Sequence, residues 1–339
     1  MNSSDKSILL FYLNNKMKNR NILFFFLMCG SSSYACDFCN CYLGLNPHYK
    51  KNSIGLRYHY MPYEGTQTSP LVLESTGLSK KDFWETRKDV ELHAQWYPVQ
   101  RLQVIVSVPY VINTEGSSAK AQAIAGNTHT HSDGTVHIHS SGTEINEGIG
   151  DPIVLGHYQI FNQANDSGKY SQRLLAGAGV KIPFGKYKIE EDDEAHERNH
   201  KTGTGSWDIL LSAIYLGKLN RTGLNVNVTY LIANTNNQNF QFGNKLNMNA
   251  TVYRQWQLKQ FRLFPNVGLY YEQSAKEWDK SYYIQNSGGN VTYAHAGMDV
   301  YFKRLSLNSG LQFPVSKNLN GNQAEIKYRI ITGISYAIN

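Results

Sequence analysis

Long apolar runs are missing from most of this sequence. After residue 35, no stretch approaches the roughly 20 apolar residues that a membrane-spanning helix needs. Basic runs are also missing, because the 33 Lys and Arg and the 26 Asp and Glu are scattered, and this argues against nucleic acid as a partner. No Ser-His-Asp order, P-loop or dinucleotide fingerprint occurs, so we expect no enzymatic activity.

The composition favours β-structure. Tyr (23) outnumbers Phe (14), Gly is abundant at 28, Pro is scarce at 9, and the hydrophobic fraction is 41%. A chain of this kind can cross a membrane only as strands closed into a barrel, since an open sheet edge cannot be satisfied in hydrocarbon.

The first 35 residues have the order of a secretory signal peptide. A basic segment at 17–20 precedes an apolar segment at 22–28, and small residues at 31–35 suit cleavage after Ala35. Cleavage would make Cys36 the first residue, which raises lipidation as an alternative. A lipidation site has an aliphatic residue three positions before the cysteine, and this position is Ser33 here, which argues against lipidation.

Period-two alternation is the strongest structural signal, because successive side chains of a strand point to opposite faces. In residues 101–112 one face carries Leu102, Val104, Val106, Val108, Tyr110 and Ile112. The segments 222–232, 246–253 and 326–337 alternate in the same way, with Asn and Thr frequent on the polar face of the first two. A soluble β-sandwich also alternates, but its core strands are short.

The alternation predicts twelve strands, near residues 54–62, 86–97, 101–112, 149–161, 172–182, 206–217, 222–232, 243–256, 261–272, 290–302, 304–313 and 324–337. Connections after even-numbered strands are short, and those after odd-numbered strands are mostly longer. Short periplasmic turns and long external loops are the asymmetry of outer-membrane barrels. We therefore expect an all-β, transmembrane, antiparallel up-and-down β-barrel of about 12 strands, over residues 54–339, with both termini periplasmic.

Three segments carry a family resemblance. They are GIGDP at 148–152, GAGVKIPFG at 177–185 and TGTGSWD at 202–208. Their order resembles the outer-membrane barrel family named after the meta-pathway of phenol degradation, whose members are described as transporters, over roughly residues 86–337. The resemblance implies a channel-type barrel without enzymatic activity and fixes no substrate. The chain departs from the usual terminal aromatic of such barrels, because it ends Tyr336-Ala337-Ile338-Asn339.

The same segments make physical sense in a barrel wall. Gly177 and Gly179 share one face, where missing side chains leave room for a bulky neighbour or a bend. Pro183 should end its strand, and Gly203 and Gly205 should let the next strand leave its loop sharply. We also expect a set of basic side chains to point inward and narrow the lumen: Arg57, Arg101, Lys181 and Arg329.

A histidine-rich stretch lies in the predicted external loop 113–148. It contains two His-x-His pairs around an Asp-Gly turn: His129, His131, His137 and His139. A three-residue hairpin loop would pair His129 with His139 and gather four imidazoles on one face, whereas a two-residue turn would separate the pairs. Imidazole suits Zn²⁺, Cu²⁺ or Ni²⁺. The alternative is a flexible polar loop with adventitious affinity.

Two further groups could bind metal. The acidic stretch 190–200 contains His196 and His200, which could concentrate cations or belong to a solvated loop.

The predicted periplasmic segment 36–53 packs three cysteines into six residues: Cys36, Cys39 and Cys41. These could form a disulfide with one thiol left over, or bind a soft ion such as Cu(I).

We therefore expect an outer-membrane channel for small solutes, with transition-metal ions captured by the His-rich loop as candidate cargo. The alternative is a barrel-anchored surface protein that scavenges or senses metal without transport. No cofactor is required, and Zn, Cu or Ni ions are the candidate ligands. The expected partners are outer-membrane lipid and the barrel assembly machinery, and the oligomeric state stays open.

Overall fold

The computed structural model describes residues 51–68, 80–117, 128–130, 136–138, 143–165, 169–187, 201–280, 282–321 and 323–338. All of them belong to one compact unit, Ser33–Asn339. Within these ranges no helix is long and apolar enough to span a membrane. The predicted signal peptide and nearly all of the predicted periplasmic segment 36–53 lie outside the described residues.

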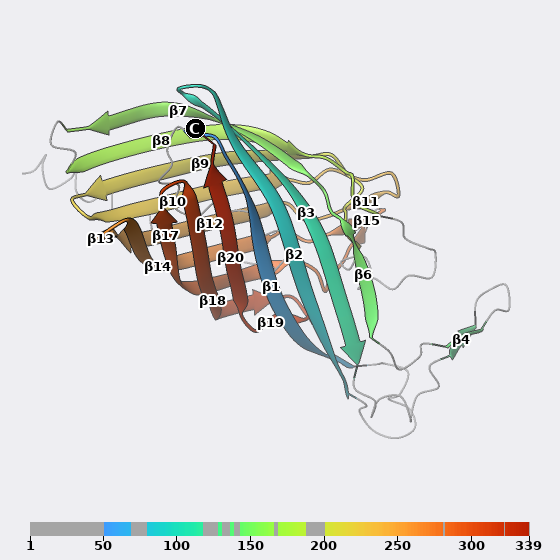
Figure 1. Cartoon of the computed structure of the whole chain (residues 1–339). Helices are drawn as coiled ribbons and strands as arrows, with labels where there is room; N and C mark the ends of the chain where they lie inside the picture. The colour runs from blue at the N-terminus through green and yellow to red at the C-terminus, as the bar shows by residue number, and fades with distance from the viewer. Residues whose placement is uncertain are drawn as a thin grey trace, which may run out of the picture. The chain divides into compact units, whose positions relative to one another are not determined.

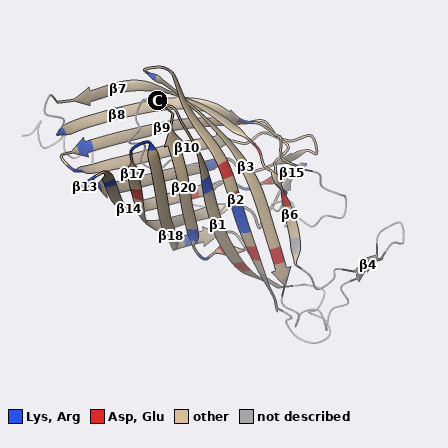
Figure 2. Cartoon of the chain, viewed as in Figure 1, with Lys and Arg blue, Asp and Glu red and all other residues tan. Residues whose placement is uncertain are grey.

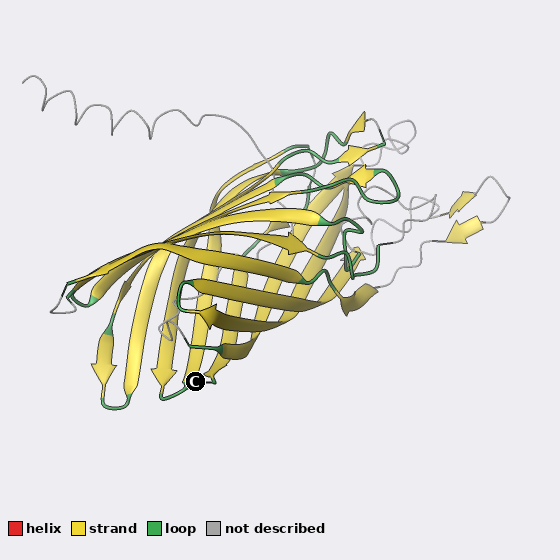
Figure 3. Cartoon of the chain, turned by 90° about the horizontal axis from the view of Figure 1, so that it is seen from above, coloured by secondary structure: helices red, strands yellow, loops and turns green. Residues whose placement is uncertain are grey.

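Twelve long strands form a closed antiparallel barrel, as the sequence predicts (Figures 1 and 3). Each strand pairs with the next along the chain, and β1 pairs with β20 to close the ring. The strands are β1 (Ser53–Thr68), β2 (Lys80–Val99), β3 (Leu102–Ser117), β7 (Ile153–Ala164), β8 (Tyr170–Lys181), β9 (Asp208–Leu219), β10 (Thr222–Ile232), β12 (Lys245–Arg254), β14 (Phe261–Ser274), β17 (Gly289–Phe302), β18 (Leu305–Leu319) and β20 (Arg329–Ala337).

Shorter strands extend this wall or lie in the loops. β6 (Glu144–Ile149) pairs with β3, β13 (Trp256–Leu258) with β14, and β19 (Glu325–Ile326) with β1. β11 (Phe240–Gln241), β15 (Trp278–Asp279) and β16 (Tyr282–Tyr283) form a separate three-stranded sheet. β4 (Thr128–Thr130) and β5 (Val136–Ile138) form a two-stranded ribbon.

The predicted alternation of short and long connections is confirmed. Residues 100–101, 220–221 and 303–304 join β2 to β3, β9 to β10 and β17 to β18. The connections at the other end are longer: 182–207, 233–244 and 275–288. Asn220 and Lys303 take positive φ angles of 54° and 52°, which two-residue hairpin turns require. We call the two ends of the barrel the turn end and the loop end.

The two faces of the wall differ as the alternation predicts. On β10, Asn225, Asn227 and Thr229 point inward and are buried, whereas Leu224 and Tyr230 are exposed on the outside. Charged residues cover little of the strand ribbons (Figure 2). An outward apolar face and an inward polar face are what a barrel in lipid requires.

The glycines at 177 and 179 do leave room for neighbours on β7. A Cβ at Gly177 would lie 2.7 Å from the Cδ2 atom of His157, and one at Gly179 would lie 2.8 Å from the Cα atom of Leu155. β8 ends at Lys181, two residues before Pro183, as expected.

Three of the four basic side chains expected in the lumen are there. Arg57, Lys181 and Arg329 are buried. Arg101 was predicted wrongly, because it lies in the two-residue turn between β2 and β3 and is exposed. The lumen is not lined by polar side chains alone, since an apolar cluster of Met61, Tyr270, Val291, Tyr293 and Ile326 lies inside it.

Candidate functional site at the loop end of the barrel

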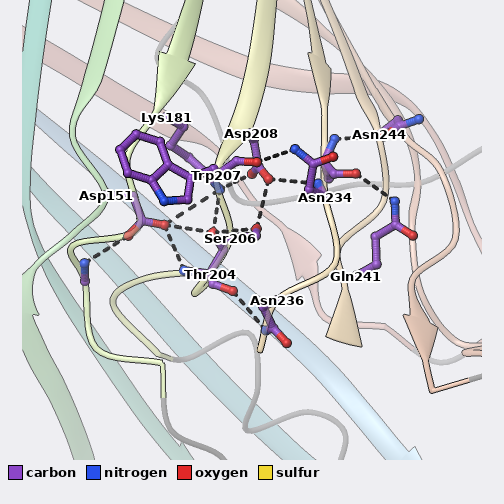
Figure 4. Close-up of polar contacts among 12 residues, drawn as sticks. Asp151, Lys181, Thr204, Ser206, Trp207, Asp208, Asn234, Asn236, Gln241 and Asn244 are labelled. Atoms are coloured by element: carbon purple, nitrogen blue, oxygen red, sulfur yellow. Dashed lines mark hydrogen bonds and ion pairs between the residues drawn. The ribbon is translucent and has the colours of Figure 1, made fainter. Parts of the chain in front are cut away.

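A buried charge network occupies the loop end where β8 stops and β9 begins (Figure 4). Lys181, the last residue of β8, is the register partner of Asp208, the first residue of β9. The Nζ atom of Lys181 lies 2.5 Å from the Oδ2 atom of Asp208, and the two side chains are 4% and 0% exposed. Lys181 also donates a hydrogen bond to the Oγ1 atom of Thr204 at 2.7 Å. An ion pair this deeply buried holds its geometry only if hydrogen bonds satisfy the remaining polar atoms.

Asp151 provides the second carboxylate of the network. Its Oδ1 atom accepts hydrogen bonds from the backbone N–H groups of Phe184 (3.1 Å) and Gly185 (2.9 Å). Its Oδ2 atom accepts from the N–H and the hydroxyl of Thr204, both at 2.8 Å, and lies 3.7 Å from Lys181 Nζ. The side chain of Asp151, which precedes β7, therefore binds both ends of the loop that joins β8 to β9.

The loop 233–244 is attached to the same network. The Oδ1 atom of Asp208 accepts hydrogen bonds from the Ser206 hydroxyl (2.8 Å) and the Asn234 backbone N–H (2.9 Å). The side-chain amide of Asn234 donates to the Trp207 carbonyl, and that of Asn236 donates to the Thr204 carbonyl at 3.0 Å. Two consecutive loops are thus held to one set of buried side chains.

Close backbone contact explains two glycines of this region. A Cβ on Gly185 would lie 2.6 Å from the Cα atom of Gly203, and the reverse holds for Gly203. The two ends of the β8–β9 loop therefore touch through their main chains. Gly205 takes a φ of +70°, in the left-handed region that favours glycine, and this supports the predicted sharp exit from the loop.

An apolar cluster lies beside the network, and we call it the mouth cluster. Its buried members are Ile153, Leu155, Leu210, Leu231, Ala233, Phe240 and Phe242, with Tyr187 and Ile284 packed against them. The ring centroids of Phe240 and Phe242 are 4.9 Å apart in an edge-to-face arrangement, and the ring of Tyr187 lies 5.7 Å from that of Phe242. The anchored loop 233–244 thus carries two phenylalanines against inward-facing side chains of β7, β9 and β10.

The predicted metal-binding residues are only partly within the described chain. β4 and β5 pair with His129 opposite His137, so these two positions lie on one face of the ribbon. This register differs from both alternatives considered above, because neither the three-residue loop, which would pair His129 with His139, nor the two-residue Asp-Gly turn sets His129 opposite His137. The following lie outside the described residues: His131, His139, His196, His200, Cys36, Cys39 and Cys41. Elsewhere in the described ranges, no group of three His, Cys, Asp or Glu side chains is placed to hold a metal ion.

The fold and the two-faced wall define an outer-membrane β-barrel, and comparisons with known proteins identify its family. Residues 87–328 match the family described as "Putative MetA-pathway of phenol degradation", and the chain belongs to this family. No match to a curated protein was found.

Three solved structures show the range of structural similarity. The COG4313 outer-membrane channel from Pseudomonas putida F1 has 12% identity and a TM-score of 0.56, over 86% of this chain and 98% of that one. The transport unit of the autotransporter AIDA-I from Escherichia coli has 10% identity and a TM-score of 0.41, over 87% and 93%. A deletion mutant of TodX, a monoaromatic hydrocarbon channel, has 8% identity and a TM-score of 0.41, over 91% and 96%. The last two similarities are too weak to bear on function.

The sequence located this region through its glycines but did not reveal the charge network. Asp151, Lys181 and Asp208 each sit inside one of the three family-like segments. Their shared feature, a single charge at a predicted strand end, was a usable signal, because charges at the end of a closed barrel can meet across neighbouring strands.

Proposed function

We propose that this protein is an outer-membrane channel for small solutes. The observation that carries the proposal is the closed barrel wall, which is apolar outside and lined inside by polar side chains such as Asn225, Asn227 and Thr229. The family match and the fold shared with an outer-membrane channel support the same reading. The reading needs no cofactor and no catalytic residue.

We further propose solutes with an apolar or aromatic part. The mouth cluster supports this, because it lies at the loop end, where a solute would enter, and its partly exposed members are the Tyr187 ring and Ile284. A cluster of this kind attracts apolar groups out of water. The family name, which refers to phenol degradation, points in the same direction.

Swelling of proteoliposomes in isosmotic solute tests both parts of the proposal. Phenylalanine and glucose are similar in size, differ in apolar surface, and cross lipid slowly. We expect swelling in both solutes and faster swelling in phenylalanine. Tyr187→Ala, at the partly exposed ring of the mouth cluster, should reduce that preference, whereas the control Tyr282→Ala, at a residue that is 78% exposed, should not. Swelling no faster than that of protein-free liposomes would contradict the channel.

The orientation and the environment are part of the proposal. The long connections all lie at one end of the barrel, and external loops are the long ones in such barrels. We therefore place the loop end outside the cell, both termini in the periplasm, and residues 1–35 and 36–53 as signal peptide and periplasmic segment. The partners would be outer-membrane lipid and the barrel assembly machinery.

Metal capture by the β4–β5 ribbon is a second candidate function. The observation that favours it is the register, which sets His129 directly opposite His137. Calorimetric titration with Zn²⁺, Cu²⁺ or Ni²⁺ should show binding that is lost when the four histidines at 129, 131, 137 and 139 are replaced by Ala. Unchanged binding would remove the site. If the protein binds metal but passes no solute in the swelling assay, the result would favour a surface metal-binding protein whose barrel serves only as a membrane anchor.

A further inference from the structure

A second buried ion pair lies inside the barrel, apart from the network of Asp151, Lys181 and Asp208. Arg329 is the first residue of β20, and Glu272 lies near the end of β14. The Nη2 atom of Arg329 is 3.3 Å from the Oε2 atom of Glu272. The two side chains are 1% and 6% exposed, so water has little access to either charge.

Three further side chains hold the pair in place. Arg329 donates through Nη1 to the Oε1 atom of Gln312 at 3.0 Å, and its Nη2 lies 3.3 Å from the Tyr293 hydroxyl. That hydroxyl donates to the Oε1 atom of Glu272 at 2.6 Å. The guanidinium carbon lies 4.6 Å from the ring centroid of Tyr293 and 5.5 Å from that of Tyr270. Contacts to two aromatic faces and two polar groups restrict the arginine to one position.

The strands involved show where the pair lies. β20, β18, β17 and β14 are successive neighbours in the sheet, so Arg329 and Glu272 come from strands three steps apart in a ring of twelve. Adjacent strands are about 4.8 Å apart, which makes three steps about 14 Å along the wall. Three steps are a quarter of the circumference. The two side chains can meet only by leaving the curved wall and crossing the interior along the chord that joins β14 to β20. We call this contact the lumen bridge.

Apolar side chains close the space beside the lumen bridge. Tyr270 and Tyr293, whose rings flank the guanidinium, belong to the cluster with Met61, Val291 and Ile326, and all five side chains are at most 2% exposed. Met61 lies on β1, the strand on the other side of β20. Side chains therefore fill this part of the lumen continuously from β14 to β1.

We propose that Arg329 is the residue that limits passage through the barrel, by occupying the lumen and by setting the balance of charge there with Glu272. This proposal rests on the proposed channel function. Bulk and charge make separate contributions: the side chain blocks part of the cross-section, and the paired charges leave the constriction with little preference for ions of either sign. Removing one charge changes the net charge of a region of low dielectric, where the effect on passing ions is strong.

Single-channel recording in planar bilayers tests the contribution of bulk. Arg329→Ala should raise the conductance at least threefold over the wild type, because it removes the chord across the lumen. Arg304→Ala is the matched control, since Arg304 is exposed in the turn between β17 and β18, and it should leave the conductance unchanged. Conductance of Arg329→Ala equal to that of the wild type would overturn the proposal.

Reversal potentials in a KCl gradient test the contribution of charge. Arg329→Gln leaves Glu272 and should shift the channel toward cations, whereas Glu272→Gln leaves Arg329 and should shift it toward anions. A merely structural role would not produce shifts of opposite sign, so equal or absent shifts would overturn the proposal. The two Gln variants also carry the test if Arg329→Ala does not give the folded, heat-modifiable barrel on gels.

The failure of this proposal can be told apart from the failure of the proposed function. If the wild type conducts and the variants behave like it, only the role of Arg329 is refuted. If folded and inserted wild type and variants are all silent, the channel function fails and the role of Arg329 fails with it.

Discussion

Replacing Lys181 with Met should destabilise the barrel strongly, because it leaves two carboxylates without their counter-ion. Asp208 and Asp151 lie 2.5 Å and 3.7 Å from the Lys181 ammonium, and all three side chains are at most 5% exposed. Removing one partner of a buried pair typically costs about 3–5 kcal/mol, since an uncompensated buried charge remains. We expect Lys181→Met to lower the free energy of unfolding by about that amount.

A double variant and an exposed pair supply the controls. Adding Asp208→Asn to Lys181→Met removes one of the two stranded charges, the one nearer to Lys181, so the double variant should lose less stability than the sum of the two single variants. Lys317→Met breaks a pair with Glu325 that has the short distance of 2.9 Å but is 26% and 54% exposed. Solvent screens such a pair, and its loss should cost about 0–1 kcal/mol.

Urea unfolding in detergent micelles, followed by tryptophan fluorescence, measures these differences. Limited proteolysis gives a second readout, because the carboxylates and their hydrogen bonds fix the loops 182–207 and 233–244. Lys181→Met should be cut in these loops faster than the wild type, and Lys317→Met should not. The reasoning would be refuted if Lys181→Met cost no more than Lys317→Met, or if the double variant lost the full sum.

Three further predictions concern the wall and its orientation. Gly177→Ala should destabilise the barrel by about 1–3 kcal/mol, because the added Cβ overpacks the neighbouring strand. Gly156→Ala is the control and should not destabilise it, since a Cβ there would have its nearest contact at 3.8 Å. Equal unfolding midpoints of the two variants would contradict this prediction. Leu56→Arg places a charge on the exposed outer face and should cost about 2–4 kcal/mol if the site lies near the bilayer midplane, measured by unfolding from lipid; no loss there would place the residue outside hydrocarbon. With the native cysteines removed, Lys280→Cys at the loop end should react with an impermeant maleimide on intact cells, and Lys259→Cys at the turn end only after lysis; the reverse pattern would invert the orientation.

The sequence predicts the strands well because the barrel wall imposes a strict period of two. Every predicted strand appears, and the register places Asn225 and Asn227 inward as the alternation requires. The prediction is less accurate where strands run past the apolar band. β2 begins at Lys80 and β1 ends at Thr68, beyond the predicted limits of 86 and 62. Charged residues at 80–85 and polar residues at 64–68 obscure the alternation there, although the hydrogen-bonded ladder continues.

The site is less predictable because its contacts join distant parts of the chain. Asp151 and Thr204 are 53 residues apart, and Glu272 and Arg329 are 57 apart. Strand prediction alone does not say which inward side chains of a closed ring meet across a chord. The pattern also did not determine the register of β4 and β5, since His129 pairs with His137 and a shift of the pairing by two residues keeps the same positions on one face.

The central claim, that the closed barrel conducts, is tested most directly by current through a planar bilayer containing the purified wild-type protein. We predict discrete current steps as single barrels insert. The contradicting result is a bilayer that stays silent although the folded protein, verified by its heat-modifiable mobility on gels, is present in the membrane.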